Sequence, residues 1–97
     1  MNELNFTWDQ KKSQSNLAKH GVSFPEAQTA FADDNARLIA DPDHSQDEER
    51  FILLGLSTKL RLLVVSHTYR KNDMEIRIIS ARKATKKEQS QYSGYLQ

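Results

Sequence analysis

The second half of the chain contains three apolar runs that are separated by short polar turns. Runs of this length that are rich in Leu, Ile and Val are typical of β-strands. Strands joined by so few residues pair antiparallel, so we expect a meander, preceded by one more short strand over residues 36–40. The runs are residues 51–56, 60–69 and 74–82, with turns expected at Thr58-Lys59 and Lys71-Asn72.

Helix-capping signals flank this strand region on both sides. They predict two consecutive helices before it and one helix after it. An α+β fold follows, in which the helices cover one face of an antiparallel sheet of about four strands. The signals are Asp9 and Gly21 around residues 10–20, Ser23 and Glu26 with Pro25 at the second helix, and Thr85 and Glu88 before residues 86–96.

The length and composition narrow the class of protein. A chain of 97 residues is expected to form one domain, residues 1–97. It has no cysteine, which excludes disulfides and thiolate zinc sites. It shows no signal-peptide pattern and no apolar run near the ~20 residues of a membrane span. We therefore expect a cytoplasmic protein that does not engage a membrane.

The net charge of +1 conceals an asymmetry between the two halves of the chain. Residues 1–50 hold five Lys and Arg against ten Asp and Glu, whereas residues 51–97 hold nine against three. Cations at a helix N-terminus oppose the helix dipole, so an anionic ligand such as phosphate would explain them. A solvated surface with carboxylate partners is the alternative. The densest group is Arg77, Arg82, Lys83, Lys86 and Lys87.

Several kinds of site are excluded or disfavoured by the sequence. With only three glycines, the chain has no phosphate-binding glycine loop. The acidic stretch does not match a calcium-binding loop, and we interpret it as a solvated loop with no metal and no cofactor. Its metal-compatible residues are Asp41, Asp43, His44, Asp47 and Glu48.

Alternation along residues 63–70 places polar side chains on both faces of one strand. His67 and Tyr69 share one face, and Thr68 and Arg70 share the other. The length of the following turn sets the partner of Arg77. A two-residue loop pairs it with Ser66, and a three-residue loop pairs it with His67, so the sequence leaves the register open.

These residue types suit RNA cleavage without a metal ion. A base takes the proton of a ribose 2′-hydroxyl, cations stabilise the phosphorane, and an acid protonates the leaving oxygen. His67 or Glu49 is a candidate base or acid, and Tyr69 is a candidate proton donor or base-stacking group. The candidate electrostatic residues are Arg50, Arg70, Arg77 and Arg82.

Two blocks of the sequence resemble the BrnT family, the toxins of type II toxin–antitoxin pairs. The first runs from Lys19 to Ala27 and the second from Arg77 to Thr85. The resemblance extends over roughly residues 6–92. It also includes Trp8-Asp9, Lys12, Asn16, Phe31, His44-Ser45, Glu49-Arg50, Gly55-Leu56-Ser57, Leu63-Val64-Val65, Thr68, Arg70, Glu88 and Tyr92.

The resemblance implies a RelE-like fold and a metal-independent ribonuclease that arrests growth. It also implies a BrnA-like antitoxin with a ribbon-helix-helix part, which neutralises the toxin, and with which the toxin represses its own operon. Operator DNA is then contacted only through the antitoxin. Many relatives carry further arginines after Lys87-Glu88, where this chain has Gln89-Ser90-Gln91. By position, the resemblance points to Glu49, Arg50, Arg70, Arg77, Arg82 and Lys83. The residues predicted to bind RNA are Arg70, Lys83, Lys86 and Lys87.

A non-enzymatic role is the alternative. The basic surface could bind only a protein partner, and the chain would then serve as a corepressor module or a degenerate toxin. Such a protein would bind its partner without degrading RNA.

Overall fold

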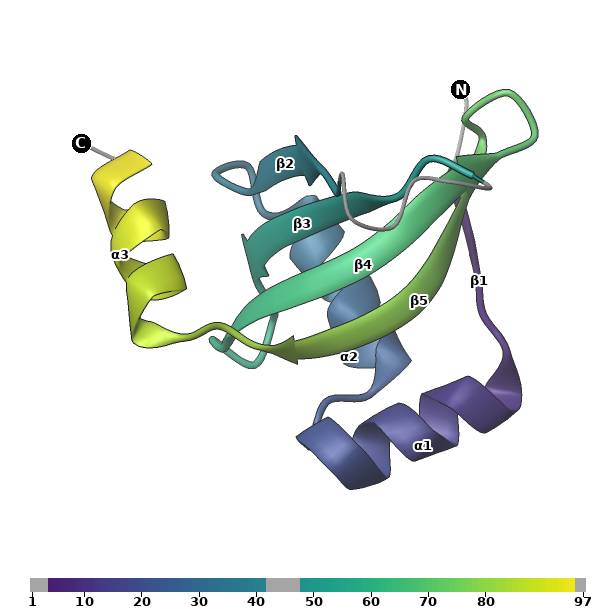
Figure 1. The fold of residues 1–97 in the computed structure, drawn as a ribbon, viewed down its shortest axis with the longest axis horizontal. Coiled ribbons are helices and arrows are strands. Elements are labelled where there is room, and N and C mark those ends of the chain that lie inside the picture. The colour runs from purple at the N-terminus through teal and green to yellow at the C-terminus, as the bar shows by residue number, and fades with distance from the viewer. Residues whose placement is uncertain (1–3, 42–47, 96–97) are drawn as a thin grey trace.

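The computed structural model describes residues 4–41 and 48–95 (Figure 1). Within them, five strands form one sheet in the order β1-β5-β4-β3-β2. The strands are β1 Asn5–Thr7, β2 Arg37–Ala40, β3 Phe51–Leu56, β4 Leu62–Arg70 and β5 Glu75–Lys83. The helices are α1 Gln10–His20, α2 Phe24–Thr29 with a 3-10 turn at Ala30–Ala32, and α3 Lys86–Tyr95.

The sheet confirms the expected meander but is not wholly antiparallel. Strands β2 to β5 pair antiparallel in sequence order. The short β1 adds a fifth strand that runs parallel to β5, with Phe6 opposite Ile76, so the sheet is mixed. A strand of three residues is too short to show alternation in the sequence, and this is why it was not predicted.

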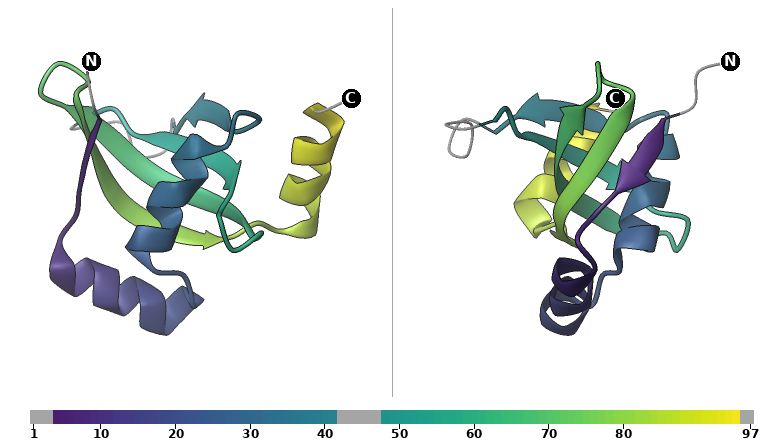
Figure 2. Two further views of the ribbon diagram at one scale, coloured as in Figure 1. Left: turned by 180° about the vertical axis from the view of Figure 1, so that it is seen from behind. Right: turned by 90° about the vertical axis from the view of Figure 1, so that its right-hand side faces the viewer.

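The helices lie on both faces of the sheet, which corrects the expectation of one covered face. Helices α1 and α2 pack on one side, whereas α3 lies on the opposite side (Figure 2). The core beneath α2 contains Phe24, Leu63 and Val65, all fully buried. On the other face, Tyr92 of α3 packs with Leu54 and Val64.

The capping signals predicted the helix starts correctly. The Asp9 carboxylate accepts hydrogen bonds from the N–H groups of Lys11 and Lys12, and Ser23 accepts one from Glu26 N–H. Helix α1 ends at Gly21, whose φ of 70° is the left-handed conformation that glycine adopts without strain.

The register between β4 and β5 matches neither of the two expected registers. The turn has four residues, so Arg70 pairs with Glu75 and Arg77 pairs with Thr68. A β-bulge then shifts the pairing, because Ser66 lies opposite Ser80 and His67 lies opposite Ile78. The extra residue in β5 reverses the alternation of side chains on either side of the bulge.

Candidate functional site

The bulge brings arginines from both ends of β5 to one side of the sheet. Strict alternation would place Arg77 and Arg82 on opposite faces, since they are five positions apart. The bulge between them puts both on the face that α1 and α2 leave uncovered. We call this surface the open face. Its polar side chains on β4 and β5 are Ser66, Thr68, Arg70, Glu75, Arg77, Ser80 and Arg82.

A groove crosses the middle of the open face. It encloses about 280 Å³, and its polar lining includes a histidine, a carboxylate, two hydroxyls and a guanidinium. Strands β3 and β4 contribute apolar lining through Ile52 and Val64. The polar lining residues are His20, Asp41, Ser66, Ser80 and Arg82.

Asn16 holds α1 against the edge of β5 and so positions His20. Its side-chain amide donates to the carbonyls of Val22 and Ala81, both at 2.8 Å, and accepts from Ala81 N–H at 3.1 Å. The side chain thus pairs with both the N–H and the C=O group of Ala81, as the backbone of a neighbouring strand would. Residues four apart lie on one face of a helix, so His20 follows Asn16 to the groove.

Asp41 lies at the other side of the groove, directly after β2. Its backbone N–H donates to the carbonyl of Arg50 at 2.8 Å, which continues the β2–β3 ladder by one residue pair. The residue is 8% exposed. His20 and Asp41 therefore line the groove from opposite edges of the sheet.

Arg82 is held in place by the cap of α3. Its guanidinium forms two parallel hydrogen bonds with the Glu88 carboxylate, at 2.8 and 2.9 Å. This pairing lowers the pKa of Glu88 from its ordinary value of 4.5 to about 2 and raises the pKa of Arg82. Glu88 also accepts a hydrogen bond from Thr85 N–H. The carboxylate thus occupies the helix N-terminus where we expected a phosphate.

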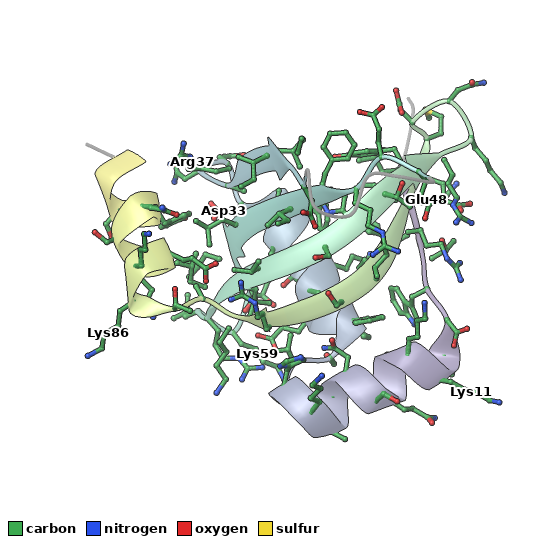
Figure 3. The ribbon with its side chains drawn as sticks, viewed as in Figure 1. Lys11, Asp33, Arg37, Glu48, Lys59 and Lys86 are labelled. Atoms are coloured by element: carbon green, nitrogen blue, oxygen red, sulfur yellow. The ribbon has the colours of Figure 1, made fainter. Side chains whose placement is uncertain are left out.

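The three lysines predicted to bind RNA lie outside the groove. Lys83, Lys86 and Lys87 are exposed, and Figure 3 shows Lys86 pointing away from the rest of the molecule. They surround the start of α3 as a solvated basic surface. Of the five cations in the predicted basic cluster, Arg82 lines the groove, whereas Arg77 and the three lysines do not.

Arg77, Arg70 and Arg50 lie further along the open face. Arg77 pairs with Thr68 and Arg82 pairs with Val64, four residues away on β4. At about 3.3 Å per residue, the two arginines therefore lie about 13 Å apart along the sheet. Arg70 forms an exposed ion pair of 3.2 Å with Glu48. Continuing the β3 register by one residue sets Arg50 opposite Thr68. The arginines thus form a track rather than one converging site.

His67 and Tyr69 lie on the covered face, away from the arginines. The His67 side chain is fully buried, with Nδ1 3.0 Å from the Val65 carbonyl and Nε2 3.3 Å from the Tyr69 hydroxyl. Its ring packs edge-on against Phe31 at 4.8 Å. Burial lowers the pKa of His67 and raises that of Tyr69. This environment suits a neutral core histidine.

Glu49 lies with Tyr69 in a separate cavity of about 580 Å³. This cavity is at the end of the sheet near β2 and does not include Arg82 or His20. Glu49, a predicted catalytic residue, is thus separate from the groove, whereas His20, Ser66 and Ser80 line the groove and were not predicted. For His20, the available signal was its position in the Lys19-His20-Gly21 block.

The metal-compatible residues of the acidic stretch are only partly described. Asp43, His44 and Asp47 lie outside the described residues. Within residues 4–41 and 48–95, no three His, Cys, Asp or Glu side chains are grouped to hold a metal ion. No helix in the same residues is long and apolar enough to cross a membrane.

Comparisons with known proteins agree on one family. A sequence model described as "Ribonuclease toxin, BrnT, of type II toxin-antitoxin system" matches residues 8–88. The crystal structure of the Brucella abortus ribonuclease toxin BrnT matches with a TM-score of 0.64 and 24% identity. The match covers 86% of this chain and 99% of that one, and shows a shared fold. No curated protein sequence matches the chain.

Proposed function

Because the chain belongs to the BrnT family of ribonuclease toxins of type II toxin–antitoxin systems, we propose that it cleaves RNA in the groove of the open face. The observation that carries this proposal is the lining of the groove. Proton-transfer groups, hydroxyl donors and a guanidinium meet in one cavity, formed by His20, Asp41, Ser66, Ser80 and Arg82.

The arginine track supports the binding of an extended RNA strand. One phosphate binds Arg82 in the groove, and neighbouring phosphates bind Arg77 and Arg70 along the open face. Guanidinium groups suit this role, because their planar donors match phosphate oxygens. A phosphate that binds Arg82 competes with Glu88, whose carboxylate forms two hydrogen bonds with the guanidinium in the free protein.

The proposed reaction is an internal transfer at phosphorus. The ribose 2′-oxygen attacks the adjacent phosphorus as its proton passes to a base, and the bond to the 5′-oxygen breaks as that oxygen gains a proton. The products are a 2′,3′-cyclic phosphate and a 5′-hydroxyl. The attacking and leaving oxygens lie on opposite sides of the phosphorus, and His20 and Asp41 line opposite sides of the groove. Arg82 stabilises the charge that develops on the phosphorane.

The antitoxin and the regulation remain part of the proposal. The family description names a type II system, in which a protein antitoxin neutralises the toxin. We propose a BrnA-like partner that represses the shared operon together with this chain and contacts the operator DNA. We also propose that the cleavage step uses side chains rather than a metal ion.

The test is cleavage of a defined single-stranded RNA by the purified chain in the presence of EDTA. Arg82→Gln is expected to lower the rate about 10²–10³-fold, as for other electrostatic groups at a reacting anion. His20→Gln is expected to lower it about 10²-fold or more. Lys19→Gln is the matched control, since this exposed neighbour of His20 does not line the groove.

Glu88→Gln tests whether Arg82 acts on RNA or only stabilises the start of α3 through its ion pair with Glu88. This variant loses the ion pair with Arg82 but keeps the guanidinium, so it should retain cleavage if Arg82 acts on RNA. Full activity in Arg82→Gln and His20→Gln would refute the groove as the site. No cleavage by the parent chain, with tight antitoxin binding and no growth arrest, would instead support the non-enzymatic corepressor.

A further inference from the structure

Strand β2 forms an edge of the sheet whose outer side is not paired with any described strand (Figure 1). Leu38 and Ile39 are 49% and 53% exposed and point to opposite faces. An exposed edge strand with apolar side chains on both faces is a template for pairing with another chain. Natural proteins block such edges with charges or proline, and the centre of this strand carries neither.

The backbone pattern of β2 shows which groups face outward. Asp41 N–H bonds inward to the Arg50 carbonyl, and the antiparallel register continues from this pair along β2. Since backbone groups alternate along a strand, Arg37 and Ile39 face β3, whereas Leu38 and Ala40 present their N–H and C=O groups outward. An incoming strand would bond to Leu38 and Ala40 without breaking a bond of the sheet.

A cavity lies beside β2 on each face of the sheet. On the face of Leu38, the cavity of about 580 Å³ is lined by the acidic residues Glu48, Glu49 and Asp73, of which Glu48 also forms the exposed ion pair with Arg70. On the face of Ile39, a cavity of about 240 Å³ is lined by Arg37, Leu54 and Gln91. Figure 3 shows Arg37 beside α3 and Glu48 near the opposite end of the sheet. The two faces therefore offer an acidic and a largely apolar environment to alternate side chains of an added strand.

We propose that β2 is the docking edge for an extended segment of the antitoxin, which adds a sixth strand to the sheet. The segment alternates cationic and apolar side chains, because cations fit the acidic cavity and apolar groups fit beside Ile39 and Leu54. Backbone hydrogen bonds supply affinity in this mode of binding, and the alternate cavities supply specificity. The identity of the partner rests on the toxin–antitoxin family and not on the proposed ribonuclease activity.

A second copy of this chain fits the edge less well. Two β2 strands paired about a two-fold axis would place both acidic cavities on the same face of the joined sheet. Their carboxylates would then repel each other, and neither copy would supply the cations. Charge thus favours a basic partner segment over self-association.

The first experiment uses a short synthetic peptide in which lysine and valine alternate. On its addition, amide hydrogen exchange at Leu38 and Ala40 should slow about tenfold or more, while Ile39, already bonded to β3, changes little. A matched peptide with glutamate in place of lysine should have no effect. Slow exchange at Leu38 that depends on the concentration of the chain alone would indicate a second copy and overturn the proposal.

The second experiment measures binding of the co-expressed antitoxin to two variants of one residue. Leu38→Ala removes the side chain, and Leu38→Pro also removes the outward N–H. The proline variant should bind at least about tenfold more weakly than the alanine variant. Because Leu38 lies outside the groove, RNA cleavage by both variants without antitoxin should equal that of the parent. Equal binding by both, together with unchanged binding by Ile39→Lys, would overturn the proposal whether or not the chain cleaves RNA.

Discussion

Replacing Asn16 with alanine tests how α1 is attached to the sheet. The Asn16 side chain is 7% exposed and makes three hydrogen bonds, two of them to the backbone of Ala81, which is 1% exposed. At about 1 kcal/mol each, their loss costs about 3 kcal/mol, and the better helix propensity of alanine returns about 0.6 kcal/mol. The free energy of unfolding should fall by about 2–3 kcal/mol, or about 10–20 °C in Tm.

The measurement is urea unfolding followed by tryptophan fluorescence. Gln14→Ala, an exposed change on the same helix, is the control and should alter stability by less than about 0.5 kcal/mol. Asn16→Asp should be worse than Asn16→Ala at neutral pH, because its carboxylate would face the carbonyl oxygens of Val22 and Ala81. If Asn16→Ala lowers the free energy of unfolding by less than about 1 kcal/mol, water or another group must bond to the N–H and C=O of Ala81 in its place. That result would refute the role of Asn16 in attaching α1 to β5.

Three further predictions concern packing and titration. Gly55→Ala should destabilise the fold by about 1–3 kcal/mol in thermal unfolding, because its Cβ would lie 2.8 Å from the Ala30 carbonyl oxygen. The low pKa of Glu88 stabilises the folded state above its ordinary value of 4.5, and this stability is lost as pH falls towards about 2. Glu88→Gln should flatten the pH dependence of unfolding in that window. Burial lowers the pKa of His67 below 6.5, so stability should fall as pH drops below that value, and His67→Phe should remove this dependence in pH-dependent urea unfolding.

Elements with local signals were predictable from the sequence. The caps at Asp9, Ser23 and Thr85 predicted the helix starts, because capping depends on residues within one helical turn. The apolar runs predicted β3, β4 and β5 and their antiparallel order. β4 begins at Leu62, two residues after the predicted start, since Leu60 adopts a φ of 62° in the preceding turn.

Features that depend on distant contacts were not predictable. Strand β1 pairs with β5 across most of the chain length and carries no pattern of its own. The bulge in β5 depends on the fit between two strands, and it alone brings Arg77 and Arg82 to one face. His67 was a candidate catalytic residue because the alternation of residues along its strand does not reveal the aromatic side chains that pack around it. The resemblance to BrnT toxins identified the family, and the structure adds the groove.

The central claim is that RNA binds in the groove beside Arg82. The most direct measurement is NMR of the labelled chain with a single-stranded oligonucleotide that is 2′-O-methylated throughout and so cannot be cleaved. We predict that the largest amide shifts map to Ser66, Ser80 and Arg82, and that Arg82→Gln greatly weakens them. Shifts confined to the cavity of Tyr69 and Glu49, or no binding at all, would contradict the account.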